Sequence, residues 1–320
     1  MDNTTALTFT MTVYAIMENH RNGFFFLFLL LYVVIVFLNG LLISLILQNK
    51  PLQQPMNVFV TMLCFNEIYG SSSLLPSVMS MLLTHRHEIS VKWCTAQVFL
   101  LHTYASAEFC ILALMGYDRF AAICYPLHYN TIMSHPKMMK LVVCGALYPF
   151  IVFGSLFSLT IKLRFCGKTM PKLYCVNMEL VKNACSNTSH ISIVGLVFIL
   201  FLLVPQISMI AFSYGHIARV CKKLSKQSQS NALKTCIPHL LSLLNYTIGS
   251  LFEIIQARFN MSRVSVQVRI FLSLYFVIIP SVANPVLYGM GSHIIRVHIM
   301  KLLIKHRMLP SKVVKKVITA

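Results

Sequence analysis

Seven long apolar segments recur along this chain, and they constrain its fold more than any other feature. A helix of about 20 residues crosses the roughly 30 Å of hydrocarbon in a membrane. Hydrocarbon offers the backbone no hydrogen-bond partner, so each segment is expected to be a helix, which satisfies its own N–H and C=O groups. The segments lie at about residues 24–47, 58–83, 94–124, 138–161, 190–217, 235–257 and 268–288.

The composition supports a membrane protein with one domain. Of the 320 residues, 57% are hydrophobic and 11% charged, whereas soluble domains carry about 25% charged residues. The predicted fold class is all-α, a seven-transmembrane helix bundle at 24–289. An N-terminal segment, 1–23, precedes the bundle, and 290–320 follows it as a tail. In this tail, apolar residues from Ile294 alternate with basic ones at helical spacing, which predicts a short amphipathic helix on the membrane surface.

The basic residues predict the orientation. Most of the Lys and Arg fall in the loops and tail opposite the N-terminus, which places that side in the cytoplasm. The N-terminus is then extracellular, and the glycosylation sequons at Asn3 and Asn187 agree with this. We expect a multi-pass protein of the plasma membrane. The net charge of +19 suits lipid headgroups and a cytosolic partner, not nucleic acid, because it is spread over short loops.

Two acids lie in the middle of predicted spans. Glu67 in the second span and Glu108 in the antiparallel third span fall at about the same depth. A carboxylate there is costly, so each is expected to face the bundle interior and to have a partner or a proton. Three interpretations stay open: a sodium ion held by both, a shared proton, or structural hydrogen bonding alone.

Four of the ten cysteines lie on the outer side, where oxidation is permitted. They are Cys94, Cys166, Cys175 and Cys185. Four cysteines allow three pairings, and the residues themselves do not choose among them. A zinc site is the rival interpretation.

Several motifs together resemble an odorant receptor of the rhodopsin-like (class A) G-protein-coupled family. The resemblance covers about residues 20–305. The matching stretches are 52–57 (Leu-Gln-Gln-Pro-Met-Asn), 115–124 with 126–129, 213–214, 234–240 and 280–288.

The resemblance implies a function and residues that carry it. A small odorant would bind in the outer part of the bundle, and a heterotrimeric G protein of the stimulatory, cyclic-AMP pathway would bind inside. The disulfides implied are Cys94 with Cys175 and Cys166 with Cys185. The residues implied in coupling and activation are Asp118, Arg119, Tyr214, His239, Asn284, Pro285 and Tyr288.

Three departures from the family pattern stand out. Glu67 replaces an Asp, and no basic residue occurs in 289–291. In the sixth span, Tyr246-Thr247-Ile248 replaces Phe-Tyr-Gly, so Thr247 stands where an aromatic is usual.

A ligand pocket is expected among the outer thirds of the third, fifth, sixth and seventh spans. It would be apolar with a few hydroxyls and one His. No acid lies in the outer part of the third span, and Glu253 meets a ligand cation only if it turns inward. The candidate lining residues are His102, Ala105, Ser106, Phe109, Phe198, Leu202, Thr247, Ser250, Leu251, Ile254 and Leu274.

Other functions find less support. No nucleophile, base and orienting acid converge, so an enzyme is not expected. The seventh span has no lysine for retinal, and the halves of the chain show no repeat of the transporter kind. No cofactor is expected apart from a possible sodium ion. A chemoreceptor of the same family acting outside olfactory tissue remains the main alternative.

Overall fold

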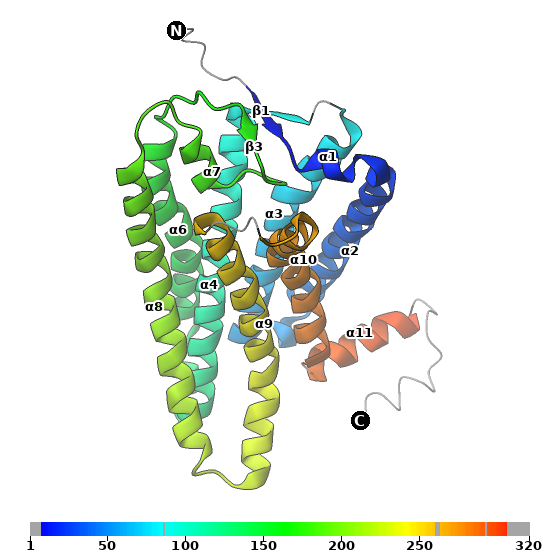
Figure 1. Cartoon of the computed structure of the whole chain (residues 1–320). Coiled ribbons are helices and arrows are strands. Elements are labelled where there is room, and N and C mark those ends of the chain that lie inside the picture. Colours follow the sequence, from blue (N-terminus) through cyan, green and yellow to red (C-terminus); the bar gives the residue numbers. More distant parts are fainter. Residues whose placement is uncertain (1–7, 86, 260–262, 292, 306–320) are drawn as a thin grey trace.

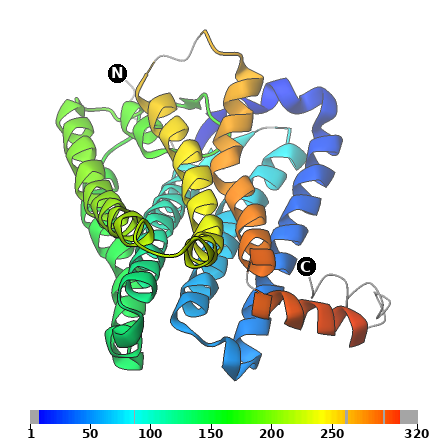
Figure 2. The same ribbon diagram turned by 90° about the horizontal axis from the view of Figure 1, so that it is seen from below.

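Seven long helices form a bundle in the computed structural model, which describes residues 8–85, 87–259, 263–291 and 293–305 (Figure 1). Seen from below, their ends are arranged around a common interior (Figure 2). The expected seven-transmembrane helix bundle is confirmed. The helices are α2 (Arg21–Gln48), α3 (Pro55–Leu83), α4 (Val91–Cys124), α6 (His135–Thr160), α8 (Ser189–Cys221), α9 (Lys226–Arg258) and α10 (Val266–Gly291).

Helix α9 differs from the other six in composition. Each of the six contains a stretch that is long and apolar enough to cross a membrane. Helix α9 is 33 residues long, but its interior face carries amide, hydroxyl and acidic side chains between Asn245 and Glu253. It also begins nine residues before the predicted boundary at 235, with Ser225 Oγ accepting a hydrogen bond from Ser228 N at 3.3 Å. The extra turns are polar, so hydropathy alone does not detect them.

A three-stranded sheet covers one end of the bundle. Its strands are β1 (Thr8–Met11), β2 (Glu88–Ser90) and β3 (Thr169–Met170), in the order β2-β1-β3. Strand β1 pairs antiparallel with β2, with Phe9 opposite Ile89, and parallel with β3. The N-terminal segment is therefore built into the fold, which the sequence did not predict. We call this end the sheet face and the opposite end the Arg119 face.

Short elements complete the described chain. On the sheet face, the Tyr14 hydroxyl donates to the Leu173 carbonyl oxygen at 2.7 Å, which ties the N-terminal segment to the long loop after α6. Helix α11 follows α10 and projects away from it (Figure 1), with Ile295 fully buried. The rest of the predicted tail lies outside the described residues. The short elements are α1 (Tyr14–Met17), α5 (Tyr129–Ile132), α7 (Asn177–Lys182), α11 (His293–Lys305) and 3-10 turns at Glu18–His20, Lys50–Leu52 and Pro126–His128.

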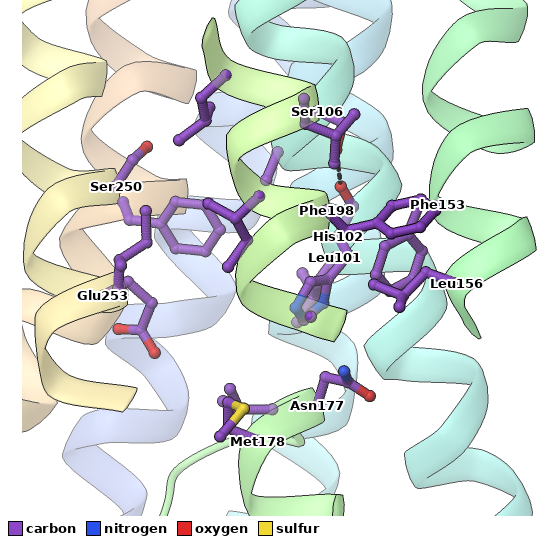
Figure 3. Close-up of a pocket in the computed structure, with 18 of the residues that line it drawn as sticks. Leu101, His102, Ser106, Phe153, Leu156, Asn177, Met178, Phe198, Ser250 and Glu253 are labelled. Carbon is purple, nitrogen blue, oxygen red and sulfur yellow. Dashed lines mark hydrogen bonds between the residues drawn. The ribbon is translucent and has the colours of Figure 1, made fainter. Parts of the chain in front are cut away.

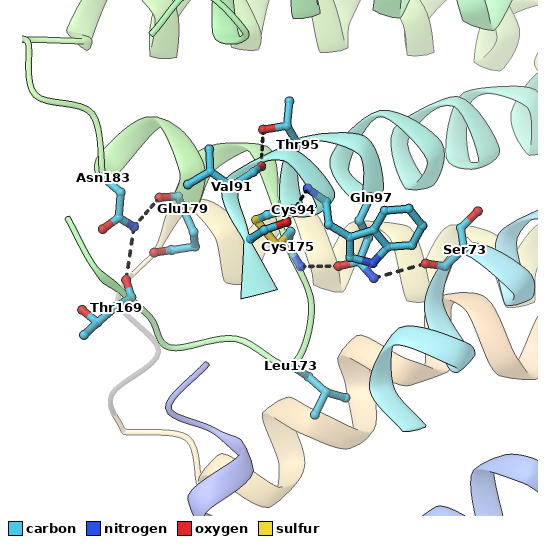
Figure 4. Close-up of a disulfide and its surroundings, with 12 residues drawn as sticks. Ser73, Val91, Cys94, Thr95, Gln97, Thr169, Leu173, Cys175, Glu179 and Asn183 are labelled. Atoms are coloured by element: carbon cyan, nitrogen blue, oxygen red, sulfur yellow. Dashed lines mark hydrogen bonds between the residues drawn. A yellow bond between two sulfur atoms is a disulfide. The ribbon is translucent and has the colours of Figure 1, made fainter. Parts of the chain in front are cut away.

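Two disulfides hold the long loop. Cys94 at the start of α4 is bonded to Cys175, and Cys166 is bonded to Cys185. Of the three possible pairings, the structure thus has the one that the resemblance implies. Gln97 strengthens the first link (Figure 4): its Oε1 accepts from Cys175 N at 3.0 Å and its Nε2 donates to the Ser73 carbonyl oxygen at 3.1 Å. The loop is therefore fastened to both α3 and α4.

At the sheet face, Glu18 gathers three basic side chains. Its carboxylate lies 3.0 Å from His85 Nδ1, 3.1 Å from His87 Nε2 and 3.5 Å from an Arg21 guanidinium nitrogen. Desolvation alone would raise the pKa of Glu18, but the hydrogen bond with His85 and the charge of Arg21 hold it below its usual value. Since the side chains are partly exposed, this cluster contributes little to stability.

Replacing Cys94 by Ser tests the loop attachment. The disulfide joins residues 81 apart, and removing a native disulfide typically costs about 2–5 kcal/mol. We expect much less Cys94→Ser protein at the cell surface and a lower unfolding temperature for the purified protein. Cys144→Ser is the control, because Cys144 is exposed and free. Equal surface amounts and unfolding temperatures for the two variants would contradict this assignment.

Candidate functional site

A cavity of about 180 Å³ lies between α4, α6, α8 and α9, under the long loop of the sheet face (Figure 3). Its wall is mostly apolar, with Phe109, Phe153 and Leu202 among the larger side chains. An apolar cavity of about 150 Å³ holds a benzene molecule. The space therefore suits a small organic molecule.

Most of the residues predicted to line a pocket do line this cavity. The structure brings together His102, Ala105, Ser106, Phe109, Phe198, Leu202, Ser250 and Ile254. They come from three helices, which the sequence placed at a common depth.

Three predicted lining residues lie elsewhere. Leu251 is 52% exposed on the outer side of α9, since it follows the cavity-facing Ser250 by about 100° of helical rotation. Thr247 is half-buried and outside the lining, because the fully buried Tyr246 fills the interior at that depth. Leu274 is buried within the packing of α10, which contributes only Phe276 to the wall.

Two parts of the wall were not predicted from the sequence. Helix α6 contributes Phe153 and Leu156, and the segment 174–178 with α7 covers the cavity. The sequence contained a signal for the segment 174–178, because a disulfide between Cys94 and Cys175 must bring the loop over the end of α4. The sequence contained no such signal for the α6 residues, because both faces of α6 are apolar.

His102 is fixed in its orientation. Its ring stacks on Phe153, with centroids 4.7 Å apart, and Nδ1 lies 2.9 Å from the Val98 carbonyl oxygen. A carbonyl oxygen only accepts hydrogen bonds. Nδ1 therefore carries the proton, and Nε2 of the neutral ring is left as an acceptor.

Aromatic rings close the cavity on the side of the bundle interior. Phe109 meets the Tyr246 ring edge to face at 4.9 Å, and the Tyr246 hydroxyl donates to the Ala105 carbonyl oxygen at 2.9 Å. Tyr246 also contacts Tyr104 and Phe276, with centroids 6.4 and 6.3 Å away. The aromatic of α9 that connects the cavity to the core is thus Tyr246.

Beyond these rings lie the two buried acids, both fully inaccessible to solvent. Asn284 Nδ2 donates to Glu67 Oε1 at 2.5 Å and to Glu108 Oε1 at 3.2 Å. The Ser281 hydroxyl donates to Glu67 at 2.6 Å, and Asn66 Nδ2 donates to Glu108 at 2.8 Å. The acids share one depth as predicted. All these donors are neutral, so no basic side chain balances the pair among the described residues.

At the Arg119 face, Asp118 is the hub of a second polar cluster. Its carboxylate is fully buried and forms an ion pair with the adjacent Arg119. The Tyr129 hydroxyl donates to Asp118 Oδ1 at 2.7 Å. Burial, and then the negative charge of Asp118, raise the pKa of Tyr129. The phenol therefore stays protonated and keeps donating.

His239 links α9 to two other helices. Its Nε2 lies 2.8 Å from the Leu112 carbonyl oxygen, so Nε2 carries the proton. Nδ1 is then the acceptor for the Tyr214 hydroxyl at 2.6 Å. Tyr288 is also buried here, and its hydroxyl has no hydrogen-bond partner in the part of the chain that the structure describes. Asn284 and Pro285 lie within the continuous helix α10.

The predicted glycosylation sites differ in what the structure describes. Asn187 is exposed in the long loop at the sheet face. Asn3 lies outside the described residues.

Comparison with known proteins points to one family. Residues 28–306 match the family described as olfactory receptor. Olfactory receptor 52D1 of Homo sapiens is 33% identical over 278 residues, which are 86% of this chain and 87% of that receptor. Olfactory receptor 11A1 of Homo sapiens is 33% identical over 283 residues, 88% of each chain. Olfactory receptor 52N2 of Homo sapiens is 29% identical over 279 residues, 87% of each chain.

Replacing Asn284 by Leu tests the cluster around the acids. The variant removes the donor that Glu67 and Glu108 share and leaves two carboxylates short of partners. Leaving a buried acceptor without its hydrogen-bond donor costs about 1–3 kcal/mol. We expect a markedly lower thermal unfolding temperature in detergent. Val286→Ala, on the same helix at a position 47% exposed, should change it little; equal losses for the two variants would contradict the cluster's role.

Proposed function

Because the chain belongs to the olfactory receptor family, we propose that it binds a small organic odorant in the cavity and activates a heterotrimeric G protein at the Arg119 face. The G protein is of the stimulatory kind and raises cyclic AMP. The receptor lies in the plasma membrane with its N-terminus and sheet face outside. The exposed Asn187 sequon and the oxidised cysteines of that face support this orientation.

One observation carries the proposal: α4 and α9 each contribute residues both to the cavity and to the polar cluster at the Arg119 face. Helix α4 lines the cavity with His102 and bears Arg119 some 17 residues on, roughly 25 Å by helix rise. Helix α9 lines the cavity with Ser250 and holds His239 near the Arg119 face. A ligand that shifts the outer half of either helix therefore changes the packing at its other end.

The connection between the two ends runs through close contacts. The Tyr246 ring of α9 packs against the Phe109 ring, and its hydroxyl donates to the Ala105 carbonyl oxygen. These contacts couple α9 to α4 at the inner end of the cavity. Further along, His239 joins α9 to α4 and to Tyr214 of α8. We propose that odorant binding moves α9, that the His239 contacts rearrange, and that Arg119 leaves Asp118 to face the G protein. Asn284-Pro285 acts as a hinge in α10, since proline removes one backbone donor there.

The two buried acids form an ion site in this proposal. Glu67 and Glu108 would hold a sodium ion that stabilises the inactive state. The donor set fits such a hard cation, because it consists of oxygen atoms and carries two carboxylates. Asn39 provides a further buried oxygen near this cluster: its Nδ2 donates at 2.9 Å to the carbonyl oxygen of Ser281, whose hydroxyl donates to Glu67, while Asn39 Oδ1 has no partner among the described residues.

A same-family chemoreceptor outside olfactory tissue would work by the same steps. The tissue in which the transcript occurs separates the two roles.

Arg119→Ala tests the coupling assignment. Loss of the guanidinium removes the cation that pairs with Asp118 in the resting state and would contact the G protein in the active one. We expect the odorant-stimulated cyclic-AMP response to be lost almost completely at equal surface amounts. Arg219→Ala, at an exposed position near the same face, is the matched control. Normal signalling by a surface-expressed Arg119→Ala variant would overturn the assignment.

Glu67→Gln tests the ion site. Basal cyclic AMP of the unmodified receptor should fall when sodium replaces choline in the medium, and the variant should lose this response. Glu88→Gln, which changes an exposed acid of the sheet face, should retain it. A response to sodium that persists in Glu67→Gln rules out the site, and an unmodified receptor indifferent to sodium favours a proton shared by the two acids.

A further inference from the structure

The polar atoms that face the cavity without a partner are mainly hydrogen-bond acceptors. Among the described residues that line it, the buried side-chain atoms without a hydrogen bond are Asn177 Oδ1, Gln206 Oε1, Ser250 Oγ and Glu253 Oε1. Two of these are amide oxygens and one is a carboxylate oxygen, all of which only accept. Only the serine hydroxyl can also donate. His102 Nε2 adds a further acceptor, because Nδ1 holds the proton.

Glu253 is the most informative of these groups, because both oxygens of a carboxylate accept hydrogen bonds, whichever way the side chain is turned. It lies one helical turn beyond Ser250 on the same face of α9, and Figure 3 shows both side chains at one side of the cavity. Its Oε2 accepts from Gln256 Nε2 at 3.2 Å, whereas Oε1 accepts nothing in the part of the chain described. One oxygen is thus held in place and the other is left open.

Among the described side chains, no cation forms an ion pair with Glu253. Lys172 is close enough for its pKa to respond: burial lowers that pKa, and the negative charges of Glu253 and Glu179 oppose the effect. Yet Lys172 Nζ makes no hydrogen bond to any described residue, and neither it nor Arg269 lines the cavity. Tyr174 also lies close to the carboxylate: burial, then the charge of Glu253 and a hydrogen bond to it, raise the pKa of the phenol. The carboxylate at the cavity therefore has neutral partners but no ion pair among the described side chains, so a cationic ligand would supply the missing charge.

The deeper end of the cavity repeats this pattern. Gln206 is 6% exposed, and its Nε2 donates to Cys110 Sγ at 3.0 Å. Oε1 of the same amide has no partner among the described residues. Ser250, 7% exposed, is likewise buried. Leaving buried acceptors unpaired is unfavourable, so a ligand that donates hydrogen bonds gains affinity by satisfying them.

We propose that the ligand is a small apolar molecule with a hydrogen-bond-donating head group, a protonated amine in preference to an alcohol, which binds Glu253 Oε1. Its hydrocarbon part lies against Phe109, Phe198 and Leu202. The amine binds more tightly than the alcohol because it adds a charge interaction to the hydrogen bond. Aldehydes and ethers bring only acceptors, and a carboxylate is repelled. This inference rests on the proposed function of the cavity.

A head-group series on one carbon chain tests the inference in cells that express the receptor, with cyclic AMP as the readout. The probes are hexylamine, hexanol, hexanal, methyl pentyl ether and hexanoate. We expect hexylamine to be the most potent and hexanol the next. The other three should be at least tenfold weaker, about 1.4 kcal/mol in binding free energy.

Glu253→Gln separates charge from hydrogen bonding. Gln keeps an acceptor and the shape of the side chain, so hexylamine should lose about tenfold or more in potency while hexanol changes little. Leu251→Ala is the matched control on the same helix, because that side chain points away from the cavity. Surface staining of each variant corrects for differences in expression.

The outcomes distinguish the inference from the proposed function. Activation by hexanal or hexanoate at lower concentrations than hexylamine and hexanol would overturn the inference and leave the odorant-receptor function standing. An equal loss for hexylamine and hexanol in Glu253→Gln would show that Glu253 only supports the fold, and would also overturn it. If neither this series nor a broad odorant panel raises cyclic AMP above the level of Arg119→Ala, the proposed function fails and the inference with it.

Discussion

Hydrocarbon cannot form hydrogen bonds, and the polar interior of this bundle is arranged around that constraint. Each helix satisfies its own backbone, so side chains such as Glu67 and Glu108 must find partners on neighbouring helices. Asn284 donates to two acids from two different helices, and His239 bridges α9 to both α4 and α8. These buried pairs determine which helix faces meet, because any other arrangement would leave a polar group in an apolar environment without a hydrogen-bond partner.

The places where polar atoms stay unpaired are then informative. Within the described residues, four of these atoms belong to side chains that line the cavity, one is Asn39 Oδ1, and one is the Tyr288 hydroxyl near the Arg119 face, whereas others, such as Thr160 Oγ1 and Arg296 Nε, lie elsewhere. The first three of these places correspond to the three steps of the proposed signal: odorant binding, stabilisation of the inactive state, and release toward the G protein. Leaving such groups unpaired weakens the resting fold locally, and a bound odorant, cation or rearranged helix can recover the loss.

Helix α9 shows how a departure from a family pattern can be absorbed. Thr247 stands where an aromatic is usual, and on sequence alone it leaves the coupling of cavity and core unexplained. In the structure the preceding residue, Tyr246, is fully buried and makes both the ring contacts and the hydrogen bond to α4. The connection therefore depends on the rotation of α9 about its axis, which brings Tyr246 inward and turns Thr247 aside.

The sequence by itself determined the number of spans, the class of fold, the common depth of Glu67 and Glu108, and the adjacent pair Asp118 and Arg119, because hydrophobic length and helix rise are local properties. Only the tertiary structure decided that Glu253 faces the cavity and Leu251 faces outward, and that α6 contributes Phe153 to the wall. In a membrane, the outer face of a helix is as apolar as its inner face, so periodicity does not reveal which side turns inward. The pairing of β1 with two distant strands was hidden for a related reason: its partners come from loops that only the assembled bundle brings together.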